Sequence, residues 1–199
     1  MHSAVAIANF FVARAEKDSV RDLNAAKLHD LVYLAHGWRL GVVGKPMIDT
    51  PVNAHRDGVF IPELREAGAW GNRRMDKALS VTRIDEARGM MVEQTPEVPA
   101  TDPAVPTLDW VWKSYGKLEP FEISRITREH GTPWDLIWND EERADDEAKL
   151  VPNGTMRLWF REEAAKRRAS QPSAPMPSKK LEATQQLLAR PDPDRLRGV

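Results

Sequence analysis

The stretch LHDLVYLAHGWRLGVVGKP, residues 28–46, decides the fold of this chain. Apolar residues recur in its first part at three- and four-residue intervals, which is the spacing of one broad face of an α-helix. Gly41, Gly44 and Pro46 follow, and they favour an end to the helix because glycine tolerates the left-handed conformation and proline cannot continue the turn. We therefore predict a buried central helix. Its core-facing residues are Leu28, Leu31, Val32, Ala35 and Trp38.

A second amphipathic helix is predicted before the central one, from about Ser3 to Glu16. Ser3 is a good N-cap, since its hydroxyl can accept a hydrogen bond from a free backbone N–H of the first turn. Apolar residues then repeat with helical spacing at Ala4, Ile7, Ala8, Phe11 and Ala15.

The pattern changes after the central helix, where prolines and Gly58 interrupt short apolar pieces between residues 45 and 62. This segment is predicted to be an ordered loop or a loop with short strands. Residues 61–67 favour one or two helical turns, and residues 79–93 favour a small hairpin around Asp85 to Gly89.

The second half of the chain favours further helices after a proline-rich connector, residues 94–106, with Thr107 as the predicted N-cap. A helix over Pro120–His130 should be closed by Gly131 and Pro133. The one before it should bury Leu108, Val111, Trp112 and Tyr115 on a single face.

The acidic segment 139–149 is predicted to be solvated surface. Asn153 is predicted to cap a last helix whose buried side carries Met156, Trp159, Phe160 and Ala164. We expect one mainly α domain over residues 1–168. Residues 169–199 are rich in Pro, Ser and Ala at their start, so we expect a flexible linker and a disordered or marginally helical tail.

Composition limits the function. Apolar residues make up 41% and charged residues 30% of the 199 residues, and no stretch is apolar enough to span a bilayer, so we expect a cytoplasmic protein with no membrane partner. Cysteine is absent, which removes thiolate metal sites and cysteine nucleophiles. Basic residues concentrate in the tail and leave the body mildly acidic, so nucleic acid is not the expected partner.

The sequence contains no glycine-rich phosphate loop, GxSxG elbow or HExxH motif. His29 and His36 are seven residues apart on the central helix, roughly 10 Å along its axis, which is too far for one metal ion. We therefore expect a protein that binds without catalysing, with no cofactor and no metal. Trp38, Trp70 and Trp134 adjoin glycine or proline, where an indole can either pin a loop or face a partner.

The run LNAAKLHDLVYLAHGWRLGVVGKPMIDTPVNAHRDGVFIPEL, which starts at Leu23, resembles the Panacea domain family. Members have a helix of the form L-x-K-L-x-Y-x-A-x-G-W, a turn beginning G-K/R-P, and then E-A-W-x-x-G-P-V-x-P. A later run, LDWVWKSYGKLEPFEISRITREHGTPW, is similar to the second half of that family, so the resemblance covers about residues 3–164. The matching positions of the first run are Lys27, Leu28, Tyr33, Ala35, Gly37, Trp38, Gly44, Lys45, Pro46, Gly58 and Pro62.

The chain departs from the family pattern in the loop, where Asn53, Ala54 and His55 stand in place of E-A-W and Val59 in place of a proline. Histidine shrinks the apolar contact and adds a group that can become charged near neutral pH. If this loop contacts the partner, partner choice is expected to differ from that of familiar members.

The resemblance implies an antitoxin that neutralises a cognate toxin by direct protein contact. SocA-like members also imply an adaptor that delivers the toxin to a AAA+ protease such as ClpXP. The alternative is a regulatory interaction module without a toxin, encoded on a phage or mobile element. The predicted partner-binding residues are Lys27, Tyr33, His36, Trp38, Pro46, His55, Arg56, Gly58, Phe60, Pro62 and Trp134.

Overall fold

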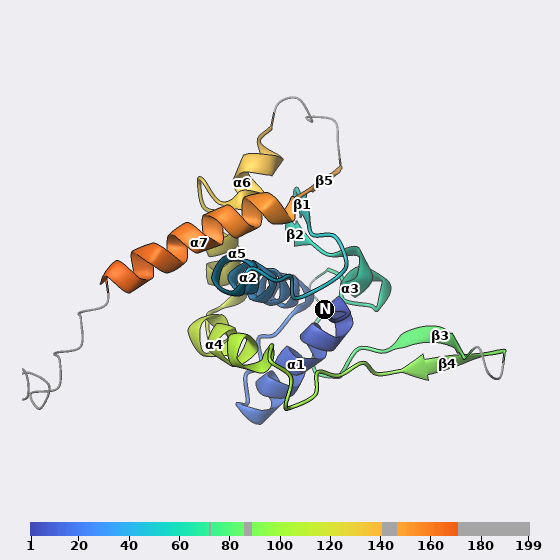
Figure 1. Ribbon diagram of the computed structural model, residues 1–199. Helices are drawn as coiled ribbons and strands as arrows, with labels where there is room; N and C mark the ends of the chain where they lie inside the picture. Colours follow the sequence, from blue (N-terminus) through green and yellow to red (C-terminus); the bar gives the residue numbers. More distant parts are fainter. Residues whose placement is uncertain (72, 86–88, 141–146, 171–199) are drawn as a thin grey trace, which may run out of the picture. The chain divides into compact units, whose positions relative to one another are not determined.

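A computed structural model describes residues 1–71, 73–85, 89–140 and 147–170 of the chain (Figure 1). Residues 1–165 form one compact unit. The tail was predicted over residues 169–199, and its part from residue 171 onward lies outside the described residues. In the described part of the chain, no helix is both long enough and apolar enough to cross a bilayer.

The described residues are mainly helical, as predicted, with two small antiparallel sheets. One sheet has the strand order β2-β1-β5, and the other is a hairpin of β3 and β4. The helices are α1 (Ala4–Lys17), α2 (Ala25–Val43), α3 (Pro62–Glu66), α4 (Val105–Tyr115), α5 (Pro120–Thr127), α6 (Pro133–Trp138) and α7 (Asn153–Ser170). The strands are β1 (Asn53–His55), β2 (Gly58–Phe60), β3 (Val81–Asp85), β4 (Met90–Gln94) and β5 (Ala148–Leu150).

Helix α2 runs through the middle of the body and packs against α1, α4 and α5 (Figure 1). Its N-cap is Asn24, whose side chain accepts the N–H of Lys27, and Gly44 ends it in the left-handed conformation with φ of 75°. The predicted stop at Gly44 is therefore confirmed, whereas Gly41 lies inside the helix. Gly41 is small for another reason: a Cβ there would lie 2.6 Å from the carbonyl carbon of Phe160 in α7.

Helix α1 confirms its prediction, because Ser3 is the N-cap and its hydroxyl accepts the N–H of Ala6. The predicted N-cap Thr107 is wrong. Helix α4 already begins at Val105, where Pro106 fits the first turn because its missing N–H has no partner there in any helix. The predicted face of α4 is buried at Leu108, Val111, Trp112 and Tyr115.

Two expectations for the second half are corrected. Helix α5 ends at Thr127, before His130, and Pro133 starts α6 instead of closing α5, with Thr132 as the N-cap of α6. The last two residues of the segment predicted to be solvated, Ala148 and Lys149, belong to β5, which pairs with β1. Lys149 of β5 is buried because its ammonium donates to the backbone carbonyls of Trp138 and Asp140, at 2.7 and 3.0 Å, near the C-terminus of α6.

Candidate partner-binding groove

An open groove of about 910 Å³ lies between the start of α2, the β1–β2 turn and the turn after α3. A shallower hollow continues from it along α3, lined by Pro62 and Glu66 and sharing Phe60, Arg65 and Trp70 with the groove. These two hollows together are called the groove below. Trp138 and Glu147 also line the groove. Its lining residues therefore come from three parts of the sequence, 25–29, 55–71 and 138–147.

The groove is lined by both small and aromatic residues. Phe60, Trp70 and Trp138 supply the aromatic surface, and Trp70 keeps 63% of its area exposed. Large apolar side chains that stay exposed beside a hollow are typical of interaction sites. The small lining residues are Ala25, Ala26, Gly58, Ala69 and Gly71.

Phe60 is the centre of the aromatic surface. The His29 ring stacks near it with a centroid distance of 6.2 Å and an interplanar angle of 14°. The Arg65 guanidinium carbon lies 5.7 Å from the Phe60 ring centroid, which is the geometry of a cation–π contact. His55 contributes a third neighbour at 5.9 Å, so Phe60 is held between two imidazoles and a cation.

His29 connects two segments that line the groove, through hydrogen bonds to the backbone of Ile61 and of Ala69. Its Nδ1 accepts the backbone N–H of Ile61 at 3.0 Å, so the proton is on Nε2, which donates to the carbonyl of Ala69 at 3.0 Å. Burial lowers the pKa of His29, which keeps the ring neutral and preserves this tautomer. His29 therefore fixes the end of β2 against the turn that carries Trp70.

His36 repeats this arrangement at a different place. Its Nδ1 accepts the N–H groups of Met47 and Ile48, at 3.3 and 3.2 Å, and its Nε2 donates to Asn153 Oδ1 at 2.8 Å. Burial lowers the pKa of His36 as well. Both histidines are thus satisfied core residues that hold loops to α2.

We expect His36→Gln to lower the free energy of unfolding by about 1–3 kcal/mol at pH 7.5, because buried N–H groups lose their acceptor. The pKa of His36 is lowered in the folded state, so the unfolded chain binds the extra proton. The stability that His36 provides is complete above pH 6.5 and decreases as the pH falls below it. Urea unfolding of both proteins from pH 7.5 to 5 should therefore show the difference shrinking; a difference independent of pH would contradict this assignment.

Five of the predicted partner-binding residues have buried side chains. Lys27 is fully buried and its ammonium pairs with Asp22 at 3.0 Å, and His36 holds the backbone as described above. Tyr33 is buried and lies edge-on to Phe160. Trp38 and Trp134 are also buried, since each packs on another aromatic ring. These side chains support the fold and present no open surface to a partner.

The other predicted residues divide by position. Pro46 follows the opposite end of α2 and does not line the groove. The remaining five, His55, Arg56, Gly58, Phe60 and Pro62, all line the groove.

Sequence reasoning did not include Arg65, Trp70 or Trp138 among the partner-binding residues. A signal existed for Trp70, since a tryptophan between Gly68 and Gly71 has little local packing. Among the described residues, no group of three or more histidine or carboxylate side chains could hold a metal ion.

The sequence model of the family "Antitoxin SocA-like, Panacea domain" matches residues 28–135. The chain belongs to this family. Neither the curated proteins nor the solved structures gave a match to the chain. The matched range includes the β1–β2 turn, α3 and Trp70, and therefore most of the groove. Membership of the SocA-like Panacea family supports an antitoxin-like role.

Proposed function

We propose that this chain neutralises a cognate toxin by direct protein contact and that the groove is the contact surface. The observation that supports this most is the exposed indole of Trp70 beside Phe60 and Arg65, in a member of a family described as antitoxins. Tryptophan and arginine are the residues most often found as binding hot spots, because they bury large areas around a few directed bonds.

The chemistry of the groove favours binding over catalysis. Both ring nitrogens of His29 are engaged by backbone groups, so this imidazole is not available as a general base. At His55, Nδ1 accepts the N–H of Asp57 at 3.2 Å. The small residues that line the groove beside its aromatic side chains leave a socket that suits one bulky apolar side chain of the toxin.

We expect Ala26→Phe to abolish toxin binding, because the new ring would fill the socket. Ala26 is exposed on the first turn of α2, so the substitution leaves the core intact. The measurement is co-expression with the product of the adjacent reading frame: the unaltered chain should restore growth and form a stable complex, and Ala26→Phe should do neither.

Ala13→Phe is the matched control, since Ala13 is exposed on α1 and does not line the groove. It should behave like the unaltered chain. Full neutralisation by Ala26→Phe would place the contact elsewhere, and failure of the unaltered chain with the correct neighbour would overturn the proposed function.

The same co-expression separates two ways of neutralising the toxin. If the chain only blocks the toxin, the amount of toxin stays constant. If it delivers the toxin to a AAA+ protease such as ClpXP, the toxin disappears, and removal of residues 169–199 as the proposed tether should preserve binding while slowing the loss.

A further inference from the structure

A buried asparagine fixes the base of the β3–β4 hairpin to the body. The Asn9 side chain on α1 accepts the N–H of Leu79 at 2.7 Å and donates to the carbonyls of Leu79 and Pro96, both at 2.9 Å. These bonds hold the two chain segments just before β3 and just after β4. Because a buried amide is costly unless its bonds are satisfied, this arrangement fixes the direction in which the hairpin leaves the body.

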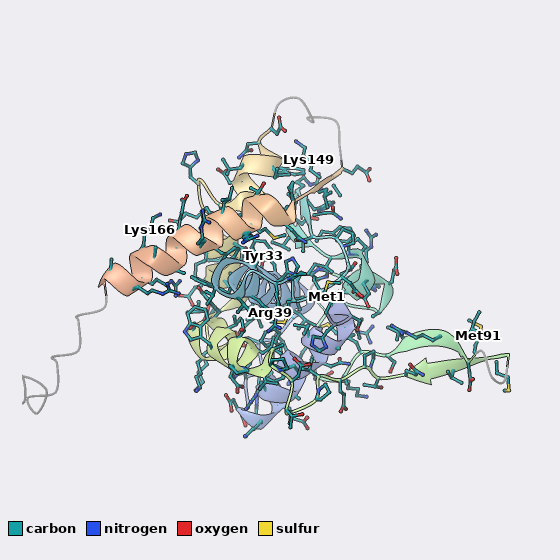
Figure 2. All side chains as sticks on the ribbon, in the orientation of Figure 1. Met1, Tyr33, Arg39, Met91, Lys149 and Lys166 are labelled. Atoms are coloured by element: carbon teal, nitrogen blue, oxygen red, sulfur yellow. The ribbon has the colours of Figure 1, made fainter. Side chains whose placement is uncertain are left out.

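The far half of the hairpin carries apolar side chains that remain exposed. Ile84 and Met91 are cross-strand partners and keep 68% and 73% of their areas exposed, and the adjacent Met90 keeps 62%. Figure 2 shows Met91 toward the far end of the hairpin, away from the packed helices. A two-stranded hairpin is marginally stable in water, and this one presents its apolar face to solvent in the described part of the chain.

The hairpin and the groove are linked through α3. Arg65 and Glu66 of α3 line the groove, while Glu63 of the same helix interacts electrostatically with Arg83 of β3. The hairpin leaves the body on the side that carries α3 (Figure 1). The two surfaces are therefore neighbours, so that one partner can reach both.

We infer that the β3–β4 hairpin is a second contact arm for the toxin that occupies the groove. This inference rests on the proposed function. The arm takes an apolar patch on the toxin, against which Ile84 and Met91 pack, since these cross-strand partners share one face of the hairpin. Methionine suits this role because its flexible thioether adapts to the shape of the surface that it meets.

The size of the hairpin favours the toxin over a second copy of this chain. A stable interface buries about 800 Å² on each partner, which is more than the exposed face of two five-residue strands can supply. A second copy held by the hairpin alone would therefore associate weakly. A toxin seated in the groove adds the area of the arm to that of the groove.

The test is the double variant Ile84→Thr with Met91→Thr, because threonine removes the apolar surface but keeps the preference for strands. Its affinity for the product of the adjacent reading frame should fall by about tenfold or more while thermal unfolding stays unchanged. Phe121→Thr is the matched control, since Phe121 on α5 is 74% exposed and is remote in sequence from the hairpin. It should bind as the unaltered chain does.

Each outcome separates the arm from the groove. Unchanged affinity of the double variant, with Ala26→Phe still unable to bind, overturns the arm and leaves the proposed function intact. If the unaltered chain does not bind the product of the adjacent reading frame, both the arm and the proposed function are overturned. If sedimentation shows a dimer that the double variant loses while toxin affinity is unchanged, the arm serves a second copy and the inference is overturned.

Discussion

Replacing Gly41 by alanine should lower the free energy of unfolding by about 1–3 kcal/mol, although alanine is the better helix former. The added Cβ would lie 2.6 Å from the carbonyl carbon of Phe160 and 2.7 Å from the backbone nitrogen of Arg161. Backbone atoms cannot turn aside as a side chain can, so α7 must move away from α2. This overpacking outweighs the gain of about 1 kcal/mol in helix propensity.

Gly154→Ala provides the control for this prediction. Gly154 lies in the first turn of α7, and a Cβ there would meet no atom within 4 Å. We expect this variant to be as stable as the unaltered chain or more stable. Urea unfolding followed by circular dichroism measures both, and a Gly41→Ala variant as stable as Gly154→Ala would show that α2 and α7 do not approach as described.

Asp30→Asn should raise the free energy of unfolding at pH 8, by up to about 4 kcal/mol for a pKa displaced by three units. Asp30 is buried on α2, and its carboxylate accepts a hydrogen bond from Thr127 Oγ1 at 2.8 Å. Burial raises its pKa from 3.8 to about 7, with the Thr127 bond and the charge of Arg128 opposing the rise. Asparagine keeps the acceptor oxygen and has no charge to desolvate.

The sign of the pH dependence follows from the raised pKa. In the folded state the protonated carboxyl is favoured, so its contribution is complete below pH 3.8 and is lost as the pH rises toward 7. The stability difference between Asp30→Asn and the unaltered chain should therefore grow from pH 4.5 to 7 and then level off. Urea unfolding across this range measures it, and a constant difference would show that Asp30 titrates normally.

Local patterns in the sequence were sufficient to predict the main helices. Ser3 gave the start of α1, Gly44 gave the end of α2, and the apolar spacing from Leu108 to Tyr115 gave the buried face of α4. One error arose where a long-range contact decides the structure. Lys149 has the charge of a surface residue but is buried, because carbonyls at the end of α6 replace its water.

The residues of the groove were predictable only in part, because long-range packing also decides which side chains line it. The family pattern led to the prediction that the loop with His55 and Phe60 binds the partner, and both residues line the groove. The same pattern also contains Lys27 and Tyr33, which are buried, and a sequence pattern does not distinguish core residues from contact residues. Trp138 joins the groove from α6, so its place depends on the packing of the whole body.

The pairing of β1 with β5 has a consequence for the timing of synthesis. Strand β1 ends at His55, whereas β5 ends at Leu150 and α7 supplies Phe160 only later. At about 5–20 residues per second, a ribosome needs about 5–20 seconds to synthesise the residues from the end of β1 to the end of β5. A nascent chain of this protein therefore has no finished groove, and the toxin contact proposed above would have to wait for that interval.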